Sequence, residues 1–202
     1  MDYFETKATL RFTYTDSYGN VSGRIVDVEL VEDGMITGKC RMKNARRTFR
    51  IDRITNCWDD STNRHVPDVL QHLRDAYAKS TAPVLDKLYA EHLDELKVLL
   101  YVGKADGQLR APELRVITAA CKVITKDTRL TDEDTRELLE SIPVPTLQGF
   151  KVAVGKIAKE NDSAAIRRIT IATRTIVDTQ QNISPGEQEA LNYIAKRLQP
   201  KG

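Results

Sequence analysis

The N-terminal part of the chain alternates apolar and polar residues with a period of two, from Thr9 to about Asp59. Leu10, Phe12 and Tyr14 alternate with polar neighbours, a pattern that is typical of a half-buried β-strand. Similar stretches follow at residues 25–30, 36–42 and 48–54, and turn residues separate them. The pattern predicts an antiparallel sheet of four or five strands. A sheet of about fifty residues is too small to bury both faces unless it curls into a barrel or packs against another element.

From Pro67 onward the apolar positions recur with a period of 3.6, which is typical of amphipathic helices. About seven helices are predicted, among them one long helix that begins at Pro83 and carries leucines as far as Leu100. The fold class is therefore α+β: a small N-terminal antiparallel β-barrel followed by an all-α helical bundle. The predicted β domain covers residues 1–58, a polar linker covers 59–66, and the helical domain covers 67–202.

Composition and charge exclude several function classes. The chain has 31 Lys+Arg and 29 Asp+Glu, so its net charge of +2 creates no long-range field that would select a partner. The sequence has no run of about 18 apolar residues and no apolar stretch of the signal-peptide type, so we expect no membrane span and a cytoplasmic location. The three cysteines fit neither a disulfide framework nor a zinc site, and we expect reduced thiols.

A basic segment stands out between Lys39 and Arg53, where seven basic residues face one acidic residue, Asp52. Such a segment can hold phosphates or another polyanion. A solvated outer face is the alternative, because carboxylates on the neighbouring strand, such as Asp27 and Glu29, can neutralise the charge through cross-strand pairs. The sequence leaves both interpretations open.

The run GMITGKCRMKNARRTFRIDRI, residues 34–54, resembles the second half of a WYL domain. The matching positions are Gly38, Cys40, Arg47, Phe49, Asp52, Arg53 and Ile54, with Phe12–Tyr14, Gly19 and Arg24 upstream. The tripeptide that names the family is here Gly34-Met35-Ile36, and no helix-turn-helix precedes the sheet. The resemblance implies an Sm-like barrel of the kind found in bacterial and phage regulators, with a basic surface that senses a nucleotide, a nucleic acid or another anion. It implies ligand contacts from Arg24, Arg41, Arg47 and Arg53, unless these arginines pair with Asp27, Asp52 or other carboxylates.

The helical half carries two similar acidic segments, which suggests an internal duplication. Asp106 and Asp178 are 72 positions apart, and Glu113 and Glu187 are 74 apart. The alanine-aspartate-glycine at residues 105–107, followed by Glu113 on the next helix, resembles the TerB-like family of tellurite-resistance proteins, which belong to stress and phage-defence systems. The resemblance implies a divalent-cation site of Asp106, Glu113, Asp178 and Glu187, whose oxygens suit Ca²⁺ or Mg²⁺. The alternative is that these glutamates only cap helices, since Ser184–Glu187 has the form of a capping box.

The sequence contains no arrangement of the kinds that order a catalytic nucleophile, and its three histidines lie among helix or loop residues. The leading hypothesis is a non-enzymatic sensor-adaptor of bacterial or phage stress defence. Its WYL-like domain would bind a nucleotide or nucleic acid, and its TerB-like domain would bind a protein partner and a divalent cation. The alternatives are a structural protein-protein interaction module with vestigial sites and a metal-dependent phosphoesterase.

Overall fold

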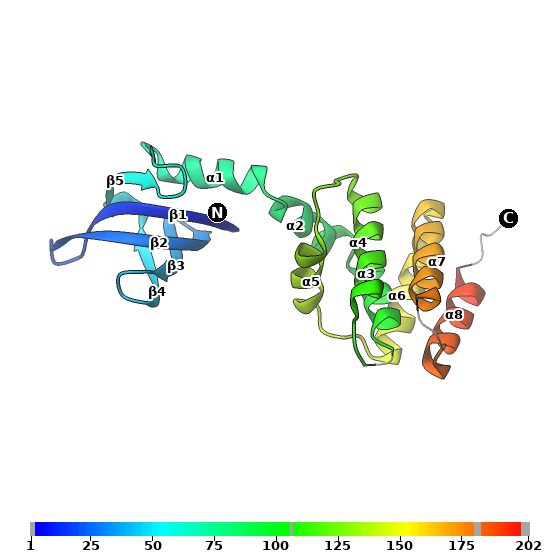
Figure 1. The fold of residues 1–202 in the computed structure, drawn as a ribbon. Helices are drawn as coiled ribbons and strands as arrows, with labels where there is room; N and C mark the ends of the chain where they lie inside the picture. The colour runs from blue at the N-terminus through cyan, green and yellow to red at the C-terminus, as the bar shows by residue number, and fades with distance from the viewer. Residues whose placement is uncertain (1–2, 106, 180–182, 199–202) are drawn as a thin grey trace. The chain divides into compact units, whose positions relative to one another are not determined.

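The computed structural model describes residues 3–105, 107–179 and 183–198. Within these residues the fold combines a six-stranded antiparallel sheet with eight α-helices, which confirms the predicted α+β class (Figure 1). The chain divides into two compact units, Met1–Pro83 and Val84–Gly202, which we call the β unit and the helical unit. Each unit has a hydrophobic core of its own.

The sheet of the β unit has the strand order β4-β3-β2-β1-β5-β6. Its strands are β1 (Tyr3–Thr15), β2 (Val21–Glu32), β3 (Met35–Cys40), β4 (Ala45–Arg50), β5 (Ile54–Asp59) and β6 (Arg64–His65), and a 3₁₀ turn, η1 (Ile51–Arg53), links β4 to β5. These pairings leave β4 and β6 as edge strands. The described strands therefore form an open sheet, and their pairings do not close the barrel that the sequence predicted.

Two features of the β2–β3 hairpin depend on glycine or on a positive φ. Its two-residue turn has Asp33 at φ 45° and Gly34 at φ 77°, as the Asp-Gly pair predicted. Further along, the register of β2 and β3 shifts between Val28 and Leu30, which marks a β-bulge. A Cβ atom at Gly38 would overlap the backbone carbonyl of Asp27, so only glycine fits opposite this bulge.

The helix α1 (Val69–Lys79) packs against β1 and completes the core of the β unit. Val66, Val69 and Leu73 are buried in the same cluster as Leu10 and the other core residues of the sheet. The predicted linker, residues 59–66, thus includes the end of β5 and the edge strand β6, and the division between the units falls after Pro83 instead. The sequence could not place α1, because an amphipathic stripe has the same period whichever core it covers.

The remaining helices pack around one apolar cluster and belong to the helical unit, except for the first two residues of α2, which precede it. They are α2 (Ala82–Glu91), α3 (Leu93–Gly103), α4 (Ala111–Thr125), α5 (Asp132–Glu140), α6 (Leu147–Glu160), α7 (Ser163–Asp178) and α8 (Pro185–Arg197). The single long helix predicted from Pro83 to Leu100 is wrong, because His92 leaves the helical conformation (φ −123°, ψ 19°) and starts α3. None of the described helices is long and apolar enough to cross a membrane.

Candidate functional site

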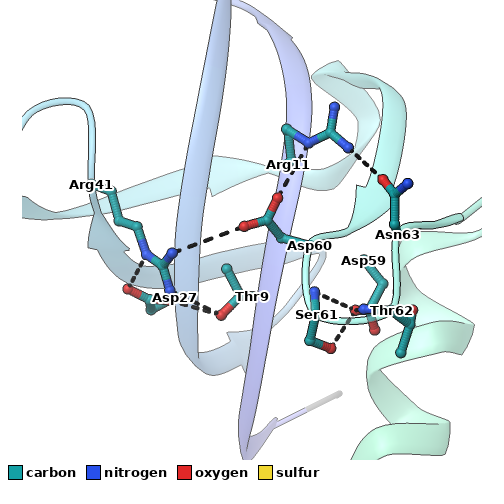
Figure 2. A network of polar contacts seen from close by, with 9 residues as sticks. All are labelled: Thr9, Arg11, Asp27, Arg41, Asp59, Asp60, Ser61, Thr62 and Asn63. Atoms are coloured by element: carbon teal, nitrogen blue, oxygen red, sulfur yellow. Dashed lines mark hydrogen bonds and ion pairs between the residues drawn. The ribbon is translucent and has the colours of Figure 1, made fainter.

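The outer face of the sheet carries a network of charged side chains from β1, from β2 and from the segments that follow β3 and β5 (Figure 2). Leu10 and Phe12 on β1 are buried, so the alternating residues Thr9 and Arg11 lie on the opposite face of the sheet. Thr9 is paired with Asp27 on β2, and Asp27 is paired with Lys39 on β3. Residues that are far apart in the sequence thus form one row across the sheet.

Arg41, which follows β3, is bound within this network. Its Nη2 lies 2.7 Å from Asp27 Oδ1 and its Nε lies 3.0 Å from Asp27 Oδ2, while Thr9 Oγ1 donates to Oδ1 at 2.8 Å. The hydrogen bond from Arg41 is the main cause that lowers the pKa of Asp27, and the same bond raises the pKa of Arg41. Arg41 therefore forms an internal ion pair, which is the second of the two interpretations that the sequence left open.

Asp60 joins Arg41 to Arg11, since the two guanidinium groups approach its carboxylate from opposite sides (Figure 2). Arg11 Nε lies 3.2 Å from Asp60 Oδ1, and Arg41 Nη1 lies 3.9 Å from Oδ2. Arg11 also donates to Asn63 Oδ1 at 2.9 Å. The charges of the outer face therefore largely neutralise one another.

The loop after β5 is held by Asp59, whose Oδ1 accepts hydrogen bonds from the backbone N–H and hydroxyl of Ser61 and from the backbone N–H of Thr62 (Figure 2). Burial works to raise the pKa of Asp59, but these hydrogen bonds outweigh it and hold the pKa at about 2. His72 Nε2 on α1 lies 3.1 Å from Asp59 Oδ2, without the angle of a hydrogen bond. The hydrogen bonds of Asp59 thus hold this loop in a defined conformation.

Two further cations of the basic segment are paired. Arg46 Nε lies 3.0 Å from Glu29 Oε2, and Arg50 donates to both carboxylate oxygens of Asp52 at 3.0 and 2.6 Å. Within the part of the chain that the structure describes, the basic residues of the β3–β4 hairpin that make no ion pair are Lys39, Lys43 and Arg47, all exposed.

The four arginines predicted as ligand contacts occupy different places in the β unit. Arg24 lies opposite the core-facing Phe12, and Arg47 lies opposite Gly38, so both have the parity of the inner face, whereas Arg41 joins the outer-face network. Arg24 donates to the backbone carbonyl of Gly23. Arg53 lies in η1, where its charge helps to lower the pKa of Asp52, after the larger effect of Arg50. The contacts of the described residues do not bring these four guanidinium groups to one ligand.

The two glutamates of the predicted cation site are both buried in the helical unit. Glu187 is 0% exposed and forms the capping box that the sequence left open as the alternative: Ser184 N–H donates to its Oε2 at 2.7 Å. Glu113 is 2% exposed, and its Oε1 accepts a hydrogen bond from Thr179 at 3.5 Å. Each keeps one buried oxygen, Glu187 Oε1 and Glu113 Oε2, that has no hydrogen-bond partner among the described residues.

The two aspartates are the remaining predicted ligands of that site. Asp178 is exposed at the end of α7, and Asp106 lies outside the described residues. No group of three or more histidine, cysteine, aspartate or glutamate side chains that could hold a metal ion occurs in residues 3–105, 107–179 and 183–198. Buried unpartnered oxygens suit a cation, but the described residues supply two candidate ligands and not a full set.

A buried ion pair between α3 and α7 was not predicted from the sequence. Arg168 Nη2 lies 3.0 Å from Glu95 Oε1, and His92 Nδ1 lies 2.9 Å from the same oxygen. Glu95 is 6% exposed. Burial, followed by the charge of Glu95, raises the pKa of the Cys121 thiol to about 12, so this cysteine stays protonated. No short-range signal marks a pair of residues that are 73 positions apart in the sequence.

An apolar groove runs between α4 and α7, with a volume of about 520 Å³. Its lining includes Val116, Ala120 and Val123 from α4 and Ile171, Ala172 and Thr175 from α7. Ile171 and Val123 are 55% and 63% exposed. We call this hollow the α4–α7 groove.

Comparisons of the chain with models of protein families, with curated proteins and with solved structures find no match. The WYL-like and TerB-like resemblances therefore stay predictions from the sequence.

Proposed function

We propose that this chain is a non-enzymatic adaptor whose β unit binds an anionic ligand, a nucleotide or nucleic acid, through the β3–β4 hairpin. The observation that carries the proposal is a surplus of unpaired positive charge on this hairpin. Residues 35–50 contain six basic residues and no acidic residue. Asp27, Glu29 and Asp52 pair with three of the six. Lys39, Lys43 and Arg47 remain exposed and make no ion pair in the described structure.

The position of the hairpin suits a flexible polyanion. β4 is an edge strand, so no described strand pairs with its outer edge. The backbone along that edge is therefore open to a ligand. Arg47 lies opposite Gly38 on β3. Because glycine has no side chain, the guanidinium group of Arg47 has no cross-strand neighbour at this position. Phosphate groups that contact such cations release counterions, which favours binding without base-specific contacts. The resemblance to WYL regulators supports the same class of ligand.

The test measures binding of a short single-stranded oligonucleotide, and separately of ADP, to the full chain by fluorescence anisotropy and calorimetry. Alanine at Lys39, Lys43 or Arg47 should weaken binding, and the slope of log K against log salt should be roughly −2 for three phosphates on a single strand. Lys159→Ala, an exposed lysine of α6, is the matched control. Unchanged affinity in all three hairpin variants would remove the proposal.

A second function is favoured by the α4–α7 groove, namely that the helical unit is a protein-protein interaction module. Exposed apolar side chains beside a hollow of about 520 Å³ are typical of binding surfaces. Both functions are compatible in one adaptor, because they use different units of the chain.

A divalent cation at Glu113 and Glu187 is the remaining proposal for the helical unit. It is supported by their buried oxygens without a hydrogen-bond partner among the described residues, Glu113 Oε2 and Glu187 Oε1. Carboxylate oxygens suit Ca²⁺ or Mg²⁺, and such an ion would give these atoms the partner that buried polar groups require. A thermal-shift experiment, set out in the Discussion, tests it.

A further inference from the structure

The α4–α7 groove lies between two antiparallel helices. Thr179, just after the end of α7, contacts Glu113 in the first turn of α4, so the two helices run in opposite directions. Small residues from both helices leave the groove open, namely Ala119 and Ala120 on α4 and Ala172 on α7. Larger apolar side chains, Val123 and Ile171, stand exposed beside them. The groove therefore has an apolar lining that no other described segment of the unit covers.

The shape of the groove suits a helix. On α4 its lining extends from Pro112 to Val123. At 1.5 Å per residue these positions span about 16 Å, the length of about three turns of an α-helix. A helix laid in such a groove presents apolar residues at positions i, i+3 or i+4, and i+7, and these side chains would fill the space above the alanines.

Two charged residues line the groove, Arg115 on α4 and Arg168 on α7, and both are basic. Apart from the buried Glu113, the charged residues of α4 are Arg115 and Lys122, and those of α7 are Arg167, Arg168, Arg174 and Asp178. Arg168 is bound to Glu95. Arg115, Lys122, Arg167 and Arg174 make no ion pair within the described residues. A partner with carboxylates beside its apolar face would be attracted by this surplus of positive charge, whereas a basic partner would be repelled.

We propose that the α4–α7 groove binds an acidic amphipathic helix of another protein, with its apolar residues over Ala119 and Ala172 and its carboxylates beside Arg115. This inference rests on the interaction role proposed above and specifies the chemistry of the partner. Apolar contact supplies the affinity, whereas the basic rim selects against other amphipathic helices.

The test uses two designed helical peptides with the same leucine positions, one with glutamate and one with lysine on the flanks. Each is labelled with fluorescein and titrated with the full chain. The glutamate peptide should bind about tenfold more tightly than the lysine peptide, and added salt should reduce this preference. Arg115→Glu should remove it.

Matched variants separate the groove from the rest of the surface. Ile171→Asp places a charge in the groove, and Ala119→Trp fills it; both positions are exposed, so the fold should persist. Each substitution should lower the affinity for the glutamate peptide about tenfold. Val152→Asp, at an equally exposed apolar position on α6 outside the groove, should leave binding unchanged.

The outcomes are distinguishable. If both peptides bind equally and Ile171→Asp weakens both, the docking role stands but the acidic partner is wrong. If neither peptide binds, or if Ile171→Asp binds like the parent chain, both proposals are overturned. If a single-stranded oligonucleotide displaces the glutamate peptide and depends on Arg115, the basic rim serves nucleic acid, and the helix proposal is overturned.

Discussion

Arg41 holds Asp27 through two hydrogen bonds, at 2.7 and 3.0 Å, and the pair spans β2 and the turn after β3. This relationship explains why the most basic segment of the sequence does not form a uniformly positive surface. Arg41 and Lys39 are two positions apart in the sequence, but only Lys39 is left without an ion pair in the described structure. The anion proposed for the β unit therefore depends on lysines and Arg47 more than on Arg41.

Arg41→Gln should lower the melting temperature slightly and leave oligonucleotide affinity almost unchanged. The pair lowers the pKa of Asp27 in the folded state, so its stabilisation is present above the ordinary pKa of 3.8 and is lost as the pH falls through the lower folded value. Loss of the pair should therefore flatten the acid side of the profile of melting temperature against pH. A large fall in affinity would instead show that Arg41 contacts the ligand.

Gly38→Ala should destabilise the β unit by about 2 kcal/mol, because the added Cβ overlaps the carbonyl of Asp27 and forces the backbone of the bulge to shift. Gly23→Ala is the control: a Cβ at Gly23 meets nothing within 4 Å. Chemical denaturation of both variants measures the difference. Equal stability of the two variants would show that the bulge adapts to the extra atom.

Local signals in the sequence were sufficient for β1, β2 and β3 and the turns between them, whereas η1 falls inside the fourth predicted strand, residues 48–54, and β6 falls inside the predicted linker. The Asp33–Gly34 pair predicted a tight hairpin, since both residues accept positive φ, and the alternation of Leu10 and Phe12 predicted the buried face of β1. The position of α1 was missed because the periodicity of a helix does not identify the core that it covers. The break at His92 was missed because the leucines before and after it continue one helical pattern.

The candidate sites depended on distances that no local pattern contains. The sequence singled out Asp27 as a possible partner of the arginines, but the bulge between Val28 and Leu30 changes which residues of β2 and β3 face one another. The capping box of Ser184 and Glu187, which the sequence left open as the alternative to a cation ligand, is formed, since the two residues are three positions apart. The α4–α7 groove could not be predicted, because it depends on which faces of two distant helices meet.

Asp59→Asn should destabilise the β unit near neutral pH and reduce the pH dependence of its stability. The folded-state pKa of Asp59 is about 2, compared with an ordinary value of 3.8. Its stabilisation is therefore full above about pH 4 and disappears as the pH falls toward 2. Melting temperatures of parent and variant should converge over this range. A constant difference between them would contradict the role of the Asp59 hydrogen bonds.

Millimolar Ca²⁺ or Mg²⁺ should raise the melting temperature of the chain if Glu113 and Glu187 ligate a cation, because an ion that binds only the folded state stabilises it. Glu113→Gln should reduce the shift, and Glu189→Gln, an exposed glutamate of α8, should not. Differential scanning fluorimetry with and without EDTA makes the measurement. If the metal causes no shift in the parent chain, Glu187 acts as a helix cap, and Glu113 acts through its contact with Thr179.

Arg168→Met should destabilise the helical unit by about 3 kcal/mol, because it leaves the carboxylate of Glu95 buried without its main partner. Glu95→Gln alone should also destabilise, since it leaves Arg168 unpaired. The double variant should lose much less than the sum of the two, because an apolar and a neutral side chain leave no isolated buried charge. Urea denaturation of the four chains gives the coupling energy. Additive losses would show that His92, which lies 2.9 Å from Glu95, or solvent compensates the carboxylate without Arg168.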